Sequence, residues 1–191
     1  MKKLTIVIPL REGSSPETTL RSLARQTFSD FDIVVVQDEK GNANWARNCG
    51  FMSVRTPFVL FSDDDIDWYP DALHCLLETL HRNPQASYSY GAYVMDDGRI
   101  QCRQEFVPAL LRARNYISTM SLLRTEDFLG FDEELQRLQD WDLWLTLLER
   151  GKVGVYCGCI IFATKLRPGI TYGGGIDYDV AERIVRNKHG I

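Results

Sequence analysis

Three consecutive carboxylates follow a short apolar segment early in the chain. The segment is Phe58–Phe61, and after Ser62 come Asp63, Asp64 and Asp65. On extended backbone, side chains two positions apart point the same way, so Asp63 and Asp65 would face one side. Grouped carboxylates are unfavourable unless a cation or backbone donors compensate for their charge. Oxygen ligands suit Mg²⁺ or Mn²⁺, so the spacing predicts a divalent-metal site that could also bind a substrate diphosphate.

Two other interpretations of this acidic segment are possible. It could be a solvated loop in which Asp67 or Asp71 caps the following helix. An EF-hand is excluded, because Trp68 stands where that loop needs Gly and no Glu occupies its twelfth position.

Three more polar residues occupy positions suited to chemistry. Asp38 follows a second apolar run and could accept hydrogen bonds from a nucleotide, or simply shape a turn. Arg47, on a predicted helix, could contact a base or a diphosphate, or be a surface charge. Asp140 begins a predicted helix, where free N–H groups stabilise a carboxylate, and could be only an N-cap. The pair Trp141 and Trp144 is typical of a core rather than of a sugar platform.

The elements that must position these residues alternate in the first half. Three short apolar runs predict buried strands, at 4–9, 32–37 and 58–61. Helical patterns follow them, over 16–27, 44–54 and 70–82. This order predicts an α/β fold, with a mostly parallel sheet and helices on both faces. Such sheets bind ligands at the carboxyl ends of their strands.

The second half predicts a different arrangement. Strands over 87–95 and 99–105 would form a hairpin around the turn at 96–98. Further predicted elements are a short helix at 107–113, a strand at 116–123, a helix at 139–150, a strand within 153–162 and a helix at 178–188. That last helix has Val180, Ile184 and Val185 as its apolar face, and the glycines at 173–175 predict a mobile loop before it.

Composition narrows the functional classes. The chain has 191 residues, with 26 acidic against 22 basic side chains, which argues against a nucleic-acid partner. The cysteine count of five is odd and no C-x-x-C pair exists, so reduced thiols in a cytoplasmic protein are expected. The first apolar run is too short for a signal peptide, and no run reaches the length of a membrane span. Peripheral contact with the inner face of a membrane stays open.

Taken together, segments from Thr5 to Gly151 resemble family 2 glycosyltransferases, which have the GT-A fold. The resemblance rests on several motifs in the family's order: T-I-V-I-P at 5–9, S-L-A-R-Q-T at 22–27, the strand ending at Asp38, A-R-N-C-G at 46–50, the D-x-D-like 63–65 with P-D-A-L at 70–73, and G-F-D-E at 130–133 with Q-D-W-D-L-W at 139–144.

The resemblance implies an inverting, metal-assisted transfer of a sugar from a nucleotide-diphosphate donor, most often a UDP-sugar. The acceptor would be a hydroxyl of a saccharide or lipid-linked molecule, as in polysaccharide biosynthesis. Asp140 would be the general base, and Asp65 with Asp63 would bind Mn²⁺ or Mg²⁺. The implied donor-nucleotide residues are Pro9, Arg11, Glu12, Asp38, Arg47, Asp63 and Asp64.

The resemblance also implies one GT-A domain over 1–191. Residues 1–105 would form its nucleotide-sugar-binding part. Residues 106–191 would form a smaller, antiparallel acceptor side that carries the base and a C-terminal tail. The segment Arg167-Pro168-Gly169 is expected on a loop that closes over the donor.

Two other functions remain open on the sequence. A nucleotidylyltransferase also uses a strand-end acid pair with a metal, but the segment after the first strand, 11–15, has one glycine where such enzymes need a Gly-rich loop. A non-catalytic or partner-dependent nucleotide-sugar-binding subunit is the second alternative. A dehydrogenase is disfavoured, because no G-x-G-x-x-G follows the first strand.

Overall fold

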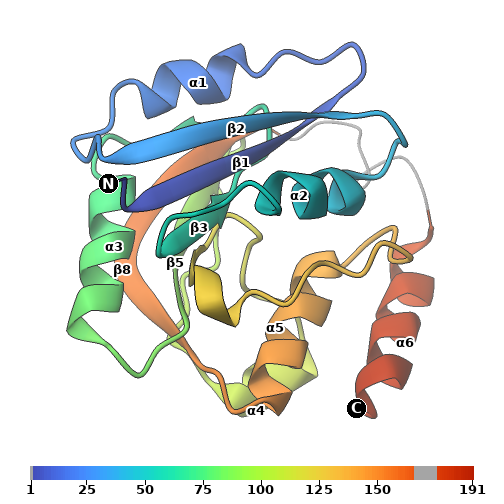
Figure 1. The fold of residues 1–191 in the computed structure, drawn as a ribbon. Helices are drawn as coiled ribbons and strands as arrows, with labels where there is room; N and C mark the ends of the chain where they lie inside the picture. Colours follow the sequence, from blue (N-terminus) through green and yellow to red (C-terminus); the bar gives the residue numbers. More distant parts are fainter. Residues whose placement is uncertain (1, 166–175) are drawn as a thin grey trace.

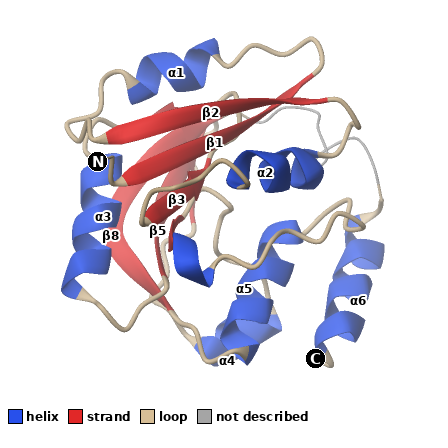
Figure 2. Ribbon diagram, in the orientation of Figure 1, coloured by secondary structure: helices blue, strands red, loops and turns tan. Residues whose placement is uncertain are grey.

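The computed structural model describes residues 2–165 and 176–191, which form one sheet with helices packed on both sides (Figures 1 and 2). The strands are β1 (Leu4–Arg11), β2 (Phe31–Asp38), β3 (Phe58–Phe61), β4 (Asp67–Trp68), β5 (Tyr88–Met95), β6 (Ile100–Gln101), β7 (Leu122–Arg124) and β8 (Gly154–Thr164). The helices are α1 (Glu17–Leu23), α2 (Ala43–Phe51), α3 (Ala72–Arg82), α4 (Pro108–Ala113), α5 (Gln139–Glu149) and α6 (Tyr178–His189), with a 3-10 turn at Thr125–Asp127.

The strands follow the order β2-β1-β3-β7-β5-β8-β4, and β6 pairs with β5. Strand β1 is parallel to β2 and β3, β7 is antiparallel between β3 and β5, and β8 is parallel to β5. Strands β1, β2, β3, β5 and β8 therefore run one way, while β4, β6 and β7 run the other. The predicted α/β fold with a mostly parallel sheet is confirmed, and the strands of the second half join the same sheet as those of the first.

The two faces of the sheet have separate cores, because successive strand residues point to opposite sides. Ile6 and Leu60 belong to a cluster shared with α1 and α3. Val7 and Phe61 belong to a second cluster, shared with α4, α5 and α6. The prediction of helices on both faces is thus confirmed (Figure 2).

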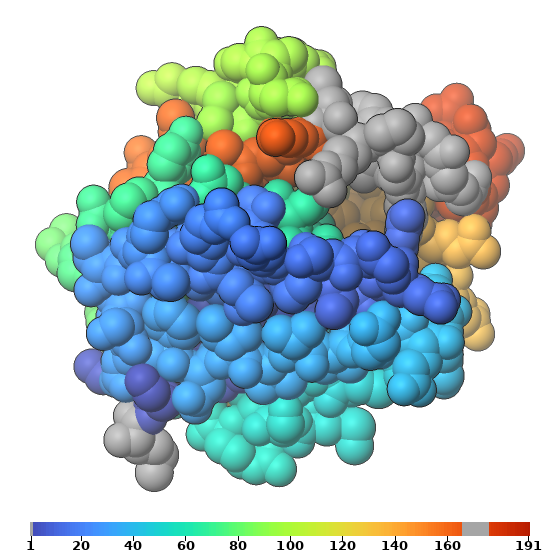
Figure 3. Space-filling view, turned by 90° about the horizontal axis from the view of Figure 1, so that it is seen from above, coloured from blue at the N-terminus to red at the C-terminus, as the bar shows by residue number. Residues whose placement is uncertain are grey.

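Strand β2 differs from its prediction as a buried strand. It lies at the edge of the sheet, where Ile33 is 37% exposed and Val35 is 42% exposed. Helix α1, which lies next to β2 in Figure 1, has only seven residues. In Figure 3 the N-terminal part of the chain, in blue, forms the middle of the face seen from above. A continuous apolar run predicts burial on both faces, but it does not reveal that a strand is the last in its sheet.

Several element boundaries also differ. The strand predicted over 116–123 is reduced to β7, because Ser118 and Ser121 bond backbone atoms nearby instead of continuing a ladder. The second hairpin strand is reduced to the two residues of β6. Strand β4, which pairs with β8, was not predicted, because two residues are too few to form a readable pattern.

Helix α6 packs on a face slightly different from the predicted one. Ala181 and Val185 are buried, whereas Ile184 is 42% exposed. The predicted loops at 167–169 and 173–175 lie outside the described residues. No helix in the described ranges is long and apolar enough to cross a bilayer.

Candidate functional site at the strand ends

The carboxyl ends of β1, β2 and β3 meet at one edge of the sheet. Arg11 is the register partner of Asp38, at the last position of both strands. The amide of Ser62, just after β3, bonds the Val7 carbonyl, so the three aspartates after Ser62 leave the sheet beside the C-terminal half of β1. Parallel pairing therefore brings together candidate residues that are distant in the sequence. Arg11 and Asp65, for example, are 54 positions apart.

The first strand and the residue after it contribute three of the predicted donor residues at this edge. Pro9 is buried within β1, whereas Arg11 and Glu12 are exposed. An exposed Arg11, opposite Asp38 at the end of the strand, supplies positive charge that a nucleotide phosphate could use. Their roles in donor binding stay predictions.

Asp38 is buried and shapes the turn that leads from β2 into α2. Its Oδ1 accepts hydrogen bonds from the amides of Asn42, at 2.7 Å, and Lys40, at 3.3 Å. The turn role considered from the sequence is therefore present in the structure. Binding of a nucleotide base by the same carboxylate stays a prediction, since one carboxylate can accept more than two hydrogen bonds.

Arg47 is a buried charge rather than a surface one. It is 4% exposed, and its Nη2 donates to Asp63 Oδ1 at 2.7 Å. Its Nη1 donates to Asn44 Oδ1 at 3.2 Å, and its guanidinium lies over the ring of Phe131. Within the described part of the chain, the buried Nε has no hydrogen-bond partner. A buried guanidinium with a donor to spare is suited to an anionic ligand.

The acidic loop is held by a threonine of α1. Thr19 Oγ1 donates to the Asp63 carbonyl at 2.9 Å and accepts from the Ile66 amide at 2.9 Å. These two bonds fix the backbone on both sides of Asp64 and Asp65. The sequence reasoning missed Thr19, because its partners lie 44 and 47 residues away.

Asp64 lies in an unfavourable electrostatic environment for a carboxylate. Burial raises the pKa of its carboxyl, and the negative charges of Asp65 and Asp63 raise it further, against a hydrogen bond from Ser14. Its Oδ2 is buried and unpaired among the described residues. Both observations fit a cation at this loop, since a cation would relieve the repulsion and supply a partner.

The described residues do not form a ready-made group of three or more His, Cys, Asp or Glu ligands for a metal. Asp63 pairs with Arg47, whereas the buried Oδ2 of Asp64 has no partner among the described residues. This is compatible with Mg²⁺, which commonly takes one or two carboxylates and completes its shell with water and substrate phosphates.

Asp140 is the second residue of α5. The preceding Leu138 adopts a left-handed backbone at φ 62°, and Trp141 N–H donates to Asp140 Oδ1 at 2.9 Å. Burial raises the pKa of Asp140, while a hydrogen bond from Asn115 and the charge of Arg47 act against that rise. A carboxyl with a raised pKa is a better proton acceptor than an ordinary one, as a general base requires.

Two asparagines of α2 hold the segment that leads to Asp140. Asn44 Nδ2 donates to the carbonyls of Asp132 and Leu135, both at 2.9 Å. Asn48 bonds both the amide of Phe131, at 2.8 Å, and its carbonyl, at 2.9 Å. The sequence reasoning missed this role, although asparagines four apart share one face of a helix. Helix α2, which carries Arg47, thus holds the segment that leads to the candidate base.

Helix α5 is held in place by its two buried tryptophans and by contacts with α6. Trp141 and Trp144 are 1% and 0% exposed, which confirms the prediction that they belong to the core. Lys188 Nζ lies 2.8 Å from Asp142 Oδ1 and 2.6 Å from Asp132 Oδ2. His189 Nε2 lies 2.8 Å from the same Asp142 oxygen. These contacts restrict the position of Asp140 at the start of the helix.

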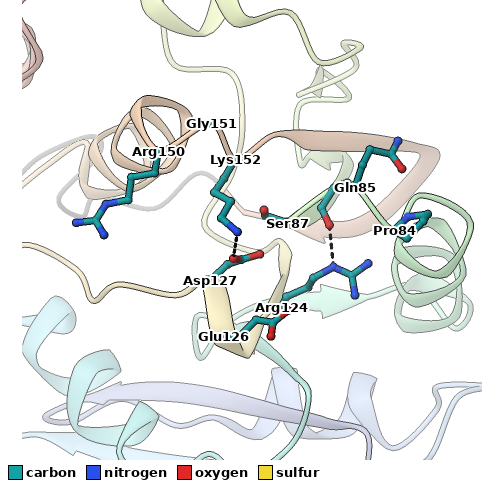
Figure 4. Close-up of a pocket in the computed structure, with 10 residues that line it drawn as sticks. Pro84, Gln85, Ser87, Arg124, Glu126, Asp127, Arg150, Gly151 and Lys152 are labelled. Carbon is teal, nitrogen blue, oxygen red and sulfur yellow. Dashed lines mark hydrogen bonds and ion pairs between the residues drawn. The ribbon is translucent and has the colours of Figure 1, made fainter.

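A pocket of about 380 Å³ lies elsewhere (Figure 4) and includes none of the predicted site residues. Lys152 pairs there with Asp127 at 2.5 Å. Arg124 donates to the carbonyls of Ala86, at 2.8 Å, and Leu80, at 3.0 Å, the latter near the end of α3. Its Lys152 and Arg124 charges thus already have structural partners, and the strand-end edge remains the better candidate site.

Comparison with known proteins supports the same family. The family described as Glycosyl transferase family 2 matches residues 39–134. An uncharacterized glycosyltransferase of Haemophilus influenzae is 25% identical, over 76% of this chain and 62% of the relative. The chain therefore spans less than two thirds of the length of that relative.

Solved structures of S. aureus TarS have a similar fold. TarS 1–349 in complex with UDP-GlcNAc gives a TM-score of 0.75 at 16% identity, over 97% of this chain and 66% of that one. TarS 1–349 in complex with UDP gives 0.70 at 17% identity, over 97% and 70%. The predicted GT-A fold is confirmed by this likeness. Because the family match spans 96 of 191 residues, from 39 to 134, this chain belongs to the family 2 glycosyltransferases.

Proposed function

We propose that this chain transfers a sugar from a nucleotide-diphosphate donor, a UDP-sugar, to a hydroxyl of a saccharide or lipid-linked acceptor, with inversion. The observation that carries the proposal is the arrangement of Asp140, Arg47 and Asp63 at one edge of the sheet. Arg47 is bonded to Asp63 and close enough to Asp140 to influence its pKa. A proton acceptor, a buried cation and an acidic loop are therefore combined where an α/β sheet binds its ligand.

In the proposed reaction, the acceptor hydroxyl oxygen attacks the anomeric carbon as the bond to the donor diphosphate breaks. Asp140 takes the hydroxyl proton, and its raised pKa favours that transfer at neutral pH. Arg47 and Arg11 supply positive charge for the leaving diphosphate. Asp38, Pro9 and Glu12 line the nucleotide side.

A divalent cation, Mn²⁺ or Mg²⁺, would be held by Asp65 with Asp63 or Asp64. Such an ion, when bound, neutralises charge on a leaving diphosphate. The unpaired Asp64 oxygen and the repulsion among the three carboxylates support this assignment.

The donor class is proposed as a UDP-sugar because UDP and UDP-GlcNAc are the ligands named for the similar TarS structures. Thermal unfolding with UDP, GDP, dTDP or CDP, each with Mn²⁺ or with EDTA, tests the proposal. We expect UDP with Mn²⁺ to raise the Tm. At a ligand concentration a hundredfold above Kd, binding should add about 2.7 kcal/mol to the free energy of unfolding. An unchanged Tm with every nucleotide would count against both the donor and the site.

The metal assignment has its own test. Asp65→Asn should abolish the Mn²⁺-dependent part of the UDP stabilisation, because it removes one carboxylate from the proposed cation site. The matched control is Asp67→Asn, because Asp67 is exposed and its carboxylate pairs with Arg25. Equal Mn²⁺ dependence in wild type and Asp65→Asn would remove Asp65 from the metal site.

A non-catalytic nucleotide-sugar-binding subunit is the second candidate function, since the chain covers only 62% of its H. influenzae relative. Slow hydrolysis of the bound UDP-sugar separates the two candidates. A catalyst should release UDP in a manner that depends on Asp140, whereas a binding subunit should bind the donor without consuming it.

A further inference from the structure

Three of the five cysteines gather where α3 packs on β8, away from the strand-end site. Cys75 lies on α3, while Cys157 and Cys159 lie on β8, and all three are free and partly buried. The Sγ atoms of Cys75 and Cys159 are 2.9 Å apart. This separation is about 1 Å longer than a disulfide bond, so bonding would need little movement.

An irregularity in β8 decides which of its two cysteines faces α3. Tyr156 pairs with Tyr90, and Ile160 pairs with Ala92. Between these two pairs β8 advances by four residues while β5 advances by two, so β8 has a bulge here. Gly158, with φ 76°, lies inside this bulge. Bulges re-aim side chains, and here the Cys159 sulfur turns toward Cys75.

Gly91 makes room for the other cysteine. A Cβ at Gly91 would lie 3.0 Å from Cys157 Sγ and 2.9 Å from the Cys159 carbonyl. Cys157 therefore lies over the β5 backbone, and it is Cys159 whose sulfur contacts that of Cys75. The two cysteines of β8 thus have different surroundings, although they are only two residues apart.

We propose that Cys75 and Cys159 form an oxidisable dithiol, a modification site that a small disulfide such as oxidised glutathione converts into a protein disulfide. One thiolate of the pair attacks the small disulfide, forms a mixed disulfide and releases one reduced small thiol. The second protein thiolate then displaces the remaining small thiol. In sum, two protein thiols are oxidised and one small disulfide is reduced to two thiols.

The surroundings set the rate of this exchange. Burial raises the pKa of Cys75 to about 12, and the neighbouring Cys159 adds to the rise. The thiolate is the attacking species, so exchange should be slow at neutral pH and accelerate as the pH rises. The product would link α3 to β8 across 84 residues of sequence.

The test is peptide mapping of the whole chain. Fully reduced protein is incubated with oxidised glutathione at pH 7 and pH 9, alkylated and digested without reduction. We expect one dominant crosslinked pair, Cys75 with Cys159, lighter by about 2 Da than the sum of its thiol peptides, and formed faster at pH 9. The Tm of the oxidised protein should rise by about 5 °C, because the crosslink restricts the unfolded chain.

The cysteine variants separate this pair from its neighbours. Cys75→Ser and Cys159→Ser should each lose the crosslink and the gain in Tm, whereas Cys157→Ser and the distant Cys49→Ser should keep both. Recovery of Cys75 and Cys159 as alkylated thiols from oxidised wild type would overturn the proposal. A crosslink that contains Cys157 as its dominant product would also overturn it.

Discussion

The strand-end edge and the region that carries Asp140 are built in different ways. At the edge, Asp38 and the three aspartates at 63–65 follow their strands directly, so parallel pairing alone brings them together. Asp140 instead lies in the first turn of α5, a helix of the second half of the chain that packs against α4 and α6. Its approach to the edge depends on Asn44 and Asn48 and on the contacts of α6.

This difference separates two kinds of residue. The edge residues are local to their strands and should affect binding when changed. The supports of Asp140, of which Asn44 also bonds Arg47, should affect turnover mainly through the position of Asp140. Three substitutions test this distinction, in order of decreasing effect.

Asp140→Asn should have the largest effect on transfer. Loss of the proton acceptor should lower kcat by about 10²-fold or more while donor affinity is retained. In wild type, kcat should fall as the pH is lowered and Asp140 becomes protonated. Because the pKa of Asp140 is raised, this fall should begin at a higher pH than it would for an ordinary carboxyl group.

The same variant should be more stable than wild type at neutral pH. Burial raises the folded-state pKa of Asp140 above its unfolded value, so ionisation costs stability as the pH rises through these two values. An uncharged Asn avoids that cost, so its Tm should exceed that of wild type at pH 7 and not at low pH. Exposed Glu134→Gln is the control; normal turnover in Asp140→Asn would refute the base role.

Asn44→Ala should have an intermediate effect. It removes two hydrogen bonds to the 132–135 segment, one of them buried, and one to Arg47, which should cost about 2 kcal/mol of unfolding free energy. If the segment positions Asp140, kcat should fall by about tenfold with little change in KM for the donor. Exposed Asn187→Ala is the matched control. A rise in donor KM at constant kcat would place Asn44 with the edge instead.

Lys188→Met should have the smallest effect. It removes the ion pairs to Asp132 and to buried Asp142, and should lower the unfolding free energy by about 1 kcal/mol in urea denaturation. Lys2→Met is the control, because its pair with Asp30 is long and both partners are well exposed. Equal losses in the two variants would show that the α6 contact is no more than a surface pair.

Much of the edge could be predicted from residues alone. Apolar runs that end in polar residues locate β1, β2 and β3, and β-α alternation requires that their ends meet. The structure kept Asp38, Arg47 and Asp63 at that edge and confirmed Trp141 and Trp144 as core. The prediction that β2 is buried was wrong, because the apolar run at 33–36 does not show that β2 is an edge strand.

The sequence by itself determined the alternating elements, the family and the candidate chemistry, because periodicity and strand-end residues are local properties of the chain. Only the tertiary structure decided that Arg47 is buried against Asp63, that α2 holds the segment before Asp140, and that Cys159 rather than Cys157 meets Cys75. The physical reason is range: these contacts join residues from 16 to 91 positions apart, and no pattern within one element encodes which distant side chain will complete its hydrogen bonds.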